Sequence, residues 1–230
     1  MSGPADLDGM KRAAARRAIA EVKDGMVVGL GSGSTAAFAI EGLGERVAKG
    51  LRIQGISTSE TTAALARRHG ISLTSFAEHA RIDLTIDGAD QVERGTLNLI
   101  KGLGGALLRE KIVAAASTRM VVIVDESKLV DRLGGRTPLP VEIVPFGCQS
   151  TIDRLSAIGG APHLRMADAR PFTTDGGNYI ADCAIPEISD PAALEARLAA
   201  VVGVVETGLF IGMASTIVIG RPTGVEIIER

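Results

Sequence analysis

The feature that most constrains the fold is a regular alternation of short apolar runs with helix-type segments. Apolar runs typical of buried strands occupy residues 26–30, 51–56, 82–86, 97–100 and 120–124, and helical periodicity covers residues 8–22, 35–47, 60–69 and 105–117. Continuous apolar strands joined by helices are typical of a parallel sheet with both faces covered. The order therefore predicts an α/β fold with a Rossmann-like parallel sheet covered by helices, and ligands beyond the carboxyl ends of the strands.

A second pattern begins after a Gly-Gly-Arg-Thr-Pro-Leu-Pro stretch at residues 134–140. Strands are expected at 141–145, 163–167, 179–184 and 202–206, and helices at 149–158 and 191–200. This β-α-β-β-α-β order is that of a ferredoxin-like unit. We expect residues 138–207 to form a small α+β domain, and residues 1–137 together with 208–230 to form the α/β catalytic domain.

Composition excludes several classes of protein. The formal net charge of -2 gives no general attraction to nucleic acid or to acidic membranes, and aromatic residues make up only 3% of the chain. The apolar stretch at 209–219 is shorter than the ~20 residues of a membrane-spanning helix, and residues 1–17 lack the pattern of a signal peptide. Cys148 and Cys183, which we interpret as small buried hydrophobes, lack CxxC spacing. A cytoplasmic protein without nucleic-acid or membrane partners is expected.

A glycine-rich turn at residues 29–35 separates the first predicted strand from the next helix. Backbone N–H groups in such a turn bind anions, and Ser32, Ser34 and Thr35 add hydroxyl donors around Gly33. The turn also fits a relaxed dinucleotide-binding fingerprint. An NAD site needs an acidic residue at the end of the second strand, but Ser-Thr-Ser follows that strand at 57–59. The hydroxyls favour a phosphate or sugar ligand, and an ordinary glycine turn with a helix cap is the alternative.

Two carboxylates, Asp87 and Asp90, follow the apolar strand at 82–86 and flank Gly88 and Ala89. Such a pair can bind hydroxyl groups, hold a metal or transfer protons, because neighbouring carboxylates separate each other's pKa values. An Asx-turn followed by a helix cap explains the same residues equally well.

The segment from Lys101 to Lys111 again contains a glycine turn and the start of a helix. Helical spacing places Glu110 on the apolar face shared by Leu107 and Val113, where burial would favour a general base. Surface pairing of Glu110 with Arg109 or Lys111 is the alternative. Lys101 and Lys128 are also notable, since lysine occurs at only six positions and both follow expected strands.

No cofactor or metal is expected from the sequence. The histidines, at 69, 79 and 163, lack ligand spacing, and zinc, haem and iron–sulfur patterns are absent, as is a GxSxG nucleophile motif.

Three motifs together resemble ribose-5-phosphate isomerase of type A: the turn at 31–35, Asp-Gly-Ala-Asp at 87–90, and the lysine turn and helix start at 101–111. Further matches are Asp-Glu-Ser-Lys at 125–128, Pro-Leu-Pro-Val-Glu at 138–142 and Gly-Leu-Phe at 208–210, so the resemblance covers nearly the whole chain. It implies interconversion of D-ribose 5-phosphate and D-ribulose 5-phosphate through an enediolate, in the non-oxidative branch of the pentose phosphate pathway. It also implies that no metal or cofactor is used, and family analogy suggests a homodimer or tetramer.

The resemblance assigns roles to individual residues. Glu110 is similar to the base that moves a proton between C2 and C1, and Asp87, Asp90 and Lys101 to the groups that open the furanose and handle the O1 and O2 protons. The implied substrate-binding residues are Ser32, Gly33, Ser34, Thr35, Gly88, Ala89, Gly102, Leu103, Gly104, Lys128 and, on the least patterned match, Lys11. Gln91 and Leu103 depart from the usual Glu and Gly.

Two other functions remain open at this point. A sugar-phosphate sensor would normally carry a helix-turn-helix, but only about ten residues precede the core of the first predicted helix. A CoA-transferase-like enzyme would need a catalytic Glu on a different turn. An assay with ribose 5-phosphate distinguishes these two functions from the isomerase, because only the isomerase forms a ketopentose from it.

Overall fold

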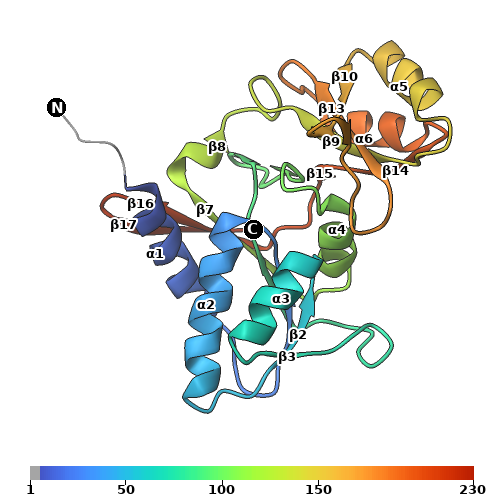
Figure 1. The fold of residues 1–230 in the computed structure, drawn as a ribbon. Helices are drawn as coiled ribbons and strands as arrows, with labels where there is room; N and C mark the ends of the chain where they lie inside the picture. The colour runs from blue at the N-terminus through green and yellow to red at the C-terminus, as the bar shows by residue number, and fades with distance from the viewer. Residues whose placement is uncertain (1–5) are drawn as a thin grey trace. The chain divides into compact units, whose positions relative to one another are not determined.

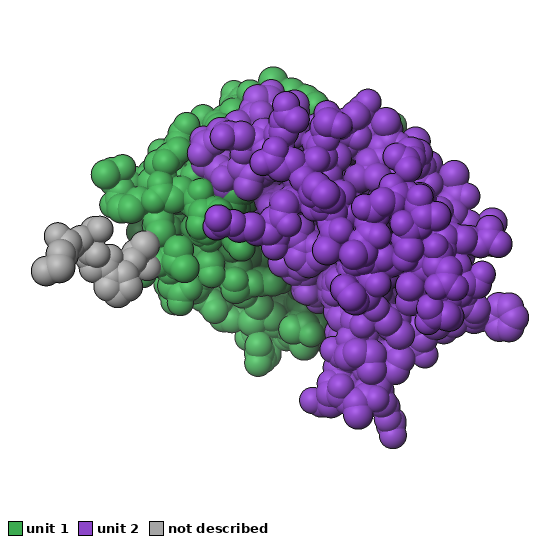
Figure 2. Space-filling view, turned by 90° about the horizontal axis from the view of Figure 1, so that it is seen from above, with its two compact units in different colours: residues 1–89, 109–128, 213–230 green, residues 90–108, 129–212 purple. Residues whose placement is uncertain are grey.

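The computed structural model describes residues 6–230 and divides into two compact units, coloured separately in Figure 2. Of the described residues, unit 1 contains 6–89, 109–128 and 213–230, and unit 2 contains 90–108 and 129–212. The segments 90–108, 129–137 and 208–212, which the sequence analysis places in the α/β domain, therefore cluster with unit 2. The chain passes between the units after residues 89, 108, 128 and 212.

Unit 1 is built on a seven-stranded sheet in the order β17-β16-β7-β4-β1-β2-β3. Its strands run parallel except β17, which pairs antiparallel with β16. The predicted α/β class is confirmed (Figure 1). The strand bounds are β1 Val27–Leu30, β2 Gln54–Ser57, β3 Ser72–Leu73, β4 Leu84–Asp87, β7 Met120–Asp125, β16 Thr216–Arg221 and β17 Gly224–Glu229.

Helices cover both faces of this sheet. Val28 and Leu30 of β1 belong to one apolar cluster with residues of the helices α1, α2 and α3, whereas Val27 belongs to another cluster with Val113 of α4. Successive side chains of a strand point to opposite faces, so α4 packs on the face opposite to the other three helices. Gly29 allows α4 to approach the sheet closely, because a Cβ at position 29 would lie only 2.7 Å from Val113 Cγ1. The helix bounds are α1 Leu7–Ile19, α2 Ser34–Ala48, α3 Glu60–Arg68 and α4 Leu107–Ala115.

Unit 2 contains the expected β-α-β-β-α-β order around an antiparallel sheet, β10-β13-β9-β14. The hairpin of β11 Met166–Ala167 and β12 Arg170–Pro171 is inserted between β10 and β13. Cys183 is buried in this unit, but Cys148 is only half-buried, so the interpretation of both cysteines as buried was wrong for Cys148. The remaining bounds are β9 Leu139–Ile143, α5 Cys148–Ala157, β10 Ala161–Leu164, β13 Tyr179–Ala184, α6 Pro191–Ala199 and β14 Val204–Thr207.

A further small sheet of unit 2, β15-β6-β5-β8, corrects one expectation. Residues 97–100 were expected to join the large parallel sheet, yet only Leu99–Ile100 form a strand, β6, which is antiparallel to both neighbours. Positive φ at Gly95 and Leu97 reverses the chain after β5 and makes β5 and β6 a hairpin. The other strands are β5 Gln91–Glu93, β8 Leu129–Val130 and β15 Leu209–Phe210.

Among the described residues, no helix is both long and apolar enough to cross a membrane.

Candidate active site

Four loops of unit 1 begin at one edge of the parallel sheet, where β1, β2, β4 and β7 end. Leu30 is in register with Ser57 and Ile86, and Asp87 is in register with Val122. The glycine turn, the Ser-Thr-Ser segment, the aspartate loop and the short helix η1 (Glu126–Lys128) therefore follow the carboxyl ends of adjacent strands. This is the edge at which doubly wound sheets bind their ligands.

The glycine turn leads from β1 into α2. Gly33 is the N-cap of α2 with a φ of +95°, a conformation that glycine adopts without strain. Ser34 and Thr35 then form the first turn of a 15-residue helix, so the hydroxyls lie at its positive end. A Cβ at Gly31 would overlap the Asp87 carboxylate, so glycine is required for the turn to pass this side chain.

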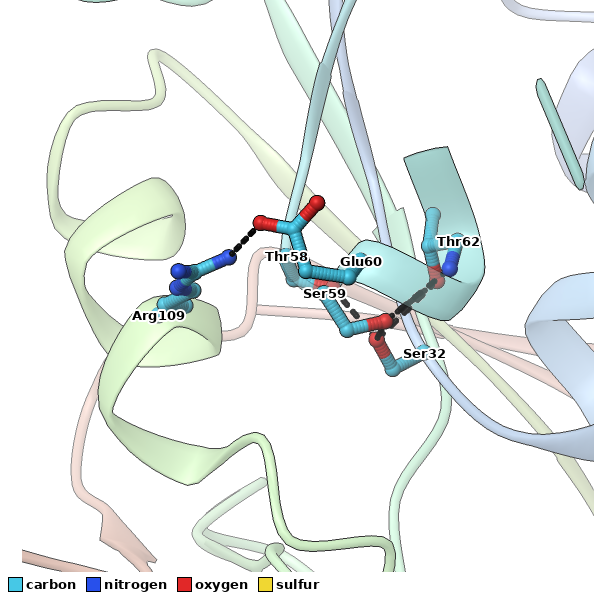
Figure 3. A network of polar contacts seen from close by, with 6 residues as sticks. All are labelled: Ser32, Thr58, Ser59, Glu60, Thr62 and Arg109. Atoms are coloured by element: carbon cyan, nitrogen blue, oxygen red, sulfur yellow. Dashed lines mark hydrogen bonds and ion pairs between the residues drawn. The ribbon is translucent and has the colours of Figure 1, made fainter. Parts of the chain in front are cut away.

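A cluster of hydroxyl groups fixes the base of this turn (Figure 3). Ser32 Oγ lies 2.8 Å from Thr58 Oγ1, 2.8 Å from Ser59 Oγ and 3.0 Å from Thr62 Oγ1. Thr58 and Thr62 in turn donate to the carbonyls of Leu30 and Gly31 at 3.0 Å. The Ser32 side chain is thus held inside unit 1, whereas Ser34 is exposed. Thr62, which was not predicted as part of this cluster, lies three residues after the N-cap Ser59, and no sequence pattern marks it.

Two lysines of unit 1, Lys11 and Lys128, also lie at this edge of the sheet. Lys11 Nζ of α1 lies 3.3 Å from Ser34 Oγ and 3.7 Å from Asp8 Oδ1, and its side chain is 16% exposed. Lys128 ends η1 and is half-buried. The structure therefore brings the weakest sequence match, Lys11, to the turn.

Asp87 is fully buried at the end of β4. Its Oδ1 accepts hydrogen bonds from the backbone N–H of Ser32 at 3.1 Å and of Gly88 at 2.7 Å. Gly88 and Ala89 are half-buried. The Asp87 carboxylate therefore connects the aspartate loop to the glycine turn. A purely local Asx-turn, the alternative interpretation, does not account for the hydrogen bond from Ser32.

Asp90 begins unit 2 and contacts the turn that follows Lys101. Its Oδ2 accepts a hydrogen bond from the backbone N–H of Leu103 at 2.9 Å, and its own N–H donates to the carbonyl of Ile100 at 2.8 Å. Lys101 is 2% exposed, and its Nζ lies 5.5 Å from the centre of the Phe210 ring. A buried ammonium over an aromatic face is stabilised by the ring quadrupole.

The turn after Lys101 accommodates the unusual Leu103. Gly102 and Gly105 have positive φ, whereas among the described non-glycine residues only Leu97 and Asp168 do, so Leu103 is not in a conformation reserved for glycine. Its side chain is exposed, as is Gly104. The other departure, Gln91, is buried and exchanges two hydrogen bonds with the backbone of Gly134, at 2.9 and 2.8 Å.

Glu110 lies in the first turn of α4 and is only 5% exposed. It precedes Val113 by three residues, and Val113 packs on the sheet, so the predicted apolar face is correct. Arg109 instead forms an ion pair with Glu60 at 2.8 Å (Figure 3). The burial of Glu110 argues against the alternative of a surface ion pair.

Within residues 6–230, no group of three or more His, Cys, Asp and Glu side chains has the arrangement of a metal site. His79 Nε2 lies 3.0 Å from Gln54 Oε1 at the surface. What the described residues do offer is, in unit 1, a buried carboxylate on α4 and an exposed helix start at Gly33 and Ser34, and, in unit 2, a buried lysine.

Comparisons with known proteins found similarities that extend over nearly the whole chain. The family model of ribose 5-phosphate isomerase A (phosphoriboisomerase A) matches residues 54–224. Proteins named ribose-5-phosphate isomerase A from Gloeobacter violaceus and Gluconobacter oxydans are 57% and 55% identical to the chain, over 97% and 98% of both partners. A solved D-ribose-5-phosphate isomerase in complex with phospho-erythronic acid has a TM-score of 0.95 at 40% identity, covering 98% of this chain and 100% of its own. Ribose 5-phosphate isomerase A of Methanocaldococcus jannaschii has a TM-score of 0.93 at 41% identity, covering 97% and 99%.

Proposed function

The chain belongs to the ribose 5-phosphate isomerase A family and interconverts ribose 5-phosphate and ribulose 5-phosphate, and we propose that it does so through an enediolate with Glu110 as the base. The observation that carries this assignment is the burial of a carboxylate in the first turn of α4, on the apolar side of that helix. A general base needs this combination of low exposure and fixed position.

The reaction moves one proton between carbons and another between oxygens. Glu110 takes the proton from C2 of the open-chain aldose, and the electron pair of the C2–H bond becomes the C1–C2 double bond. The electrons of the C1–O1 π bond move to O1, which is then protonated. Return of the proton from Glu110 to C1, with loss of the O2 proton, completes the ketose without gain or loss of electrons.

Asp87, Asp90 and Lys101 are proposed to open the furanose and to manage the charges on O1 and O2. The Lys101 ammonium stabilises a developing oxyanion, since a fixed positive charge in a buried setting does so strongly. Carboxylates such as Asp87 and Asp90 accept and return hydroxyl protons. The backbone of Gly88 and Ala89 in unit 1, and of Gly102, Leu103 and Gly104 in unit 2, is proposed to contact the sugar; of these residues Leu103 and Gly104 are exposed.

The phosphate is proposed to bind at the start of α2. The N–H groups and hydroxyls of Gly33, Ser34 and Thr35 supply donors, and Lys11 and Lys128 supply positive charge. Ser32 contributes by shaping the turn, because its hydroxyl is engaged in the cluster with Thr58, Ser59 and Thr62.

The proposed chemistry is tested by isotope exchange. In deuterated water, an enediolate formed by Glu110 leads to deuterium at C1 of ribulose 5-phosphate and at C2 of returned ribose 5-phosphate, as read by NMR. The Glu110→Gln variant should show neither. Exchange at C2 that persists in this variant would assign proton abstraction to another group.

We also propose a cytoplasmic location and a homo-oligomer, a dimer or tetramer. The two cysteines are free thiols, as is usual in a reducing compartment. In unit 2 Phe146 and Val202 are 94% and 78% exposed, and packing them against a second copy would remove this apolar surface from water. Sedimentation velocity on the intact chain measures the assembly, and a monomer at micromolar concentration would contradict this proposal.

A further inference from the structure

Arg165 lies between β10 and β11, and its guanidinium donates to four acceptor atoms of unit 2. Nη1 donates to the carbonyl of Gly102 at 3.1 Å and to that of Leu103 at 3.0 Å. Nε and Nη2 donate to the two carboxylate oxygens of Asp182 at 2.8 and 2.5 Å. Each guanidinium nitrogen is therefore engaged, and one side of the fork contacts the turn that follows Lys101.

The position of the guanidinium is set by its own surroundings. Asp182 lies on β13, and the side chains of Arg165 and Asp182 are only 14% and 24% exposed. The backbone N–H of Arg165 donates to the carbonyl of Ile180, and its carbonyl accepts from the N–H of Phe172, both at 2.8 Å. A bidentate ion pair of low exposure with both backbone groups engaged has little freedom to move.

The contact continues through one peptide group to Asp90. The Gly102 carbonyl that accepts from Arg165 belongs to the same peptide group as the Leu103 N–H, which donates to Asp90 Oδ2 at 2.9 Å. A cation at the oxygen and a carboxylate at the N–H polarise this peptide in the same direction, so each hydrogen bond strengthens the other. The Leu103 carbonyl shares its peptide with the Gly104 N–H in the same way.

We propose that Arg165 is a positioning residue of the isomerase, which holds the turn from Gly102 to Gly104 and, through the Gly102–Leu103 peptide, the Asp90 carboxylate. Arg165 does not itself touch the sugar. The inference rests on the proposed function, because it takes Asp90 and Lys101 as groups that act on the substrate.

Lysine cannot replace arginine in this role. A planar fork donates to a carboxylate and to two carbonyls at once, whereas an ammonium is a single point with no fixed plane. The turn also packs against the same hairpin, since a Cβ at Gly105 would lie 2.5 Å from Phe172 Cζ. Loss of the guanidinium therefore removes the hydrogen bonds to the turn, whereas the packing of Phe172 against the turn remains.

The test compares Arg165→Lys with Arg170→Lys, a matched change at an exposed position of the same hairpin. We expect Arg165→Lys to lower kcat by ~10-fold or more, because small displacements of catalytic groups are costly, with a smaller change in KM. Arg170→Lys should stay within ~2-fold of the parent, as surface changes usually do. Thermal unfolding of both variants shows that the comparison is made on folded protein.

A double-mutant cycle separates positioning from general stability. In an Asp90→Asn background, Arg165→Lys should lower kcat by less than ~3-fold, because residues that act through one another are non-additive. Equal losses in the two backgrounds, or a normal kcat of Arg165→Lys, overturn the inference. If Arg165→Lys does not fold, Asp182→Asn, which removes the charge that orients the guanidinium, is put through the same cycle and judged by the same two outcomes.

Failure of the proposed function looks different. A normal kcat of Asp90→Asn itself would remove Asp90 from the reaction, whatever Arg165 does. A low kcat of Asp90→Asn with a normal kcat of Arg165→Lys would leave the proposed function intact and reject the inference alone.

Discussion

The backbone N–H of Ser32 donates to Asp87 Oδ1 at 3.1 Å, so the turn that begins α2 is fixed by a carboxylate at the end of β4. The phosphate-type turn and a proposed acid–base group are therefore not independent parts of unit 1. A change in either one is expected to disturb the other, which the Gly31→Ala variant tests.

Replacing Glu110 by Gln should lower kcat by at least ~10²-fold, the lower end for loss of a general base. The amide keeps the shape of the side chain but cannot accept the proton. Steady-state assays of ketopentose formation measure the effect. A phosphorylated sugar acid that mimics the enediolate should still bind the variant, as measured by calorimetry.

The control for Glu110 is Glu45→Gln, the same chemical change at an exposed site on α2. It should leave kcat within ~2-fold of the parent, as surface changes usually do. Near-normal turnover of a folded Glu110→Gln protein would show that Glu110 is structural.

Replacing Gly31 by Ala should destabilise unit 1 and reduce activity together. The new Cβ overlaps the Asp87 carboxylate, and relief of that overlap moves the turn or the aspartate. Overpacking of this kind costs about 1–3 kcal/mol of unfolding free energy, which urea titration measures. Gly176→Ala, where a Cβ meets its neighbours at 3.5 Å or more, should be close to neutral. An unchanged unfolding midpoint for Gly31→Ala would contradict the close approach.

Replacing Lys11 by Met should raise KM for ribose 5-phosphate by ~10-fold with a smaller change in kcat, since a removed charge weakens ground-state and transition-state binding alike. The Lys11 ammonium lies 3.3 Å from Ser34 Oγ, at the proposed phosphate site. Lys49→Met, at the exposed C-cap of α2, serves as the matched control. The parent should also prefer ribose 5-phosphate strongly over ribose, and comparable kcat/KM on the two sugars would remove the phosphate role.

The two cysteines should differ in reactivity. Burial, with a smaller contribution from the negative charge of Asp182, raises the pKa of the Cys183 thiol to about 12. Because the thiolate is the reactive form, Cys183 stays protonated and unreactive at pH 8 and gains reactivity only as the pH approaches 12 or the chain unfolds. Mass spectrometry after iodoacetamide treatment should find the half-buried Cys148 modified first. Equal rates in the native protein would contradict the burial of Cys183.

Turnover should survive exhaustive chelation. The described residues contain no group of His, Cys, Asp and Glu side chains suited to a metal, and the proposed steps use a carboxylate base and a lysine. Activity after EDTA treatment and gel filtration, compared with an untreated sample, tests this expectation. Loss of turnover that one added metal restores would overturn it.

The sequence by itself determined the local elements and the edge at which chemistry gathers. Apolar periodicity placed β1, β2, β4 and β7 of the large sheet and the helices between them, because burial on both faces forces a continuous apolar run, whereas β3, β16 and β17 were not predicted as strands. The same periodicity placed Glu110 on an apolar face, and the structure buries it to 5% exposure. Glycines beside Ser34 and Lys101 indicated turns because their backbone conformations exclude most other residues.

Tertiary structure alone decided which distant side chains meet. Pairing of β6 with β5 and β15, and not with the large sheet, follows from a chain reversal near Leu97 that no periodicity marks. The contacts of Ser32 with Thr58 and Thr62, and of Arg165 with the carbonyls of Gly102 and Leu103, join residues 26 to 63 positions apart. A side-chain hydrogen bond needs a donor–acceptor distance of about 3 Å, and between residues far apart in the chain it leaves no periodic pattern in the sequence. Such partners are therefore found only when the folded backbone brings them together.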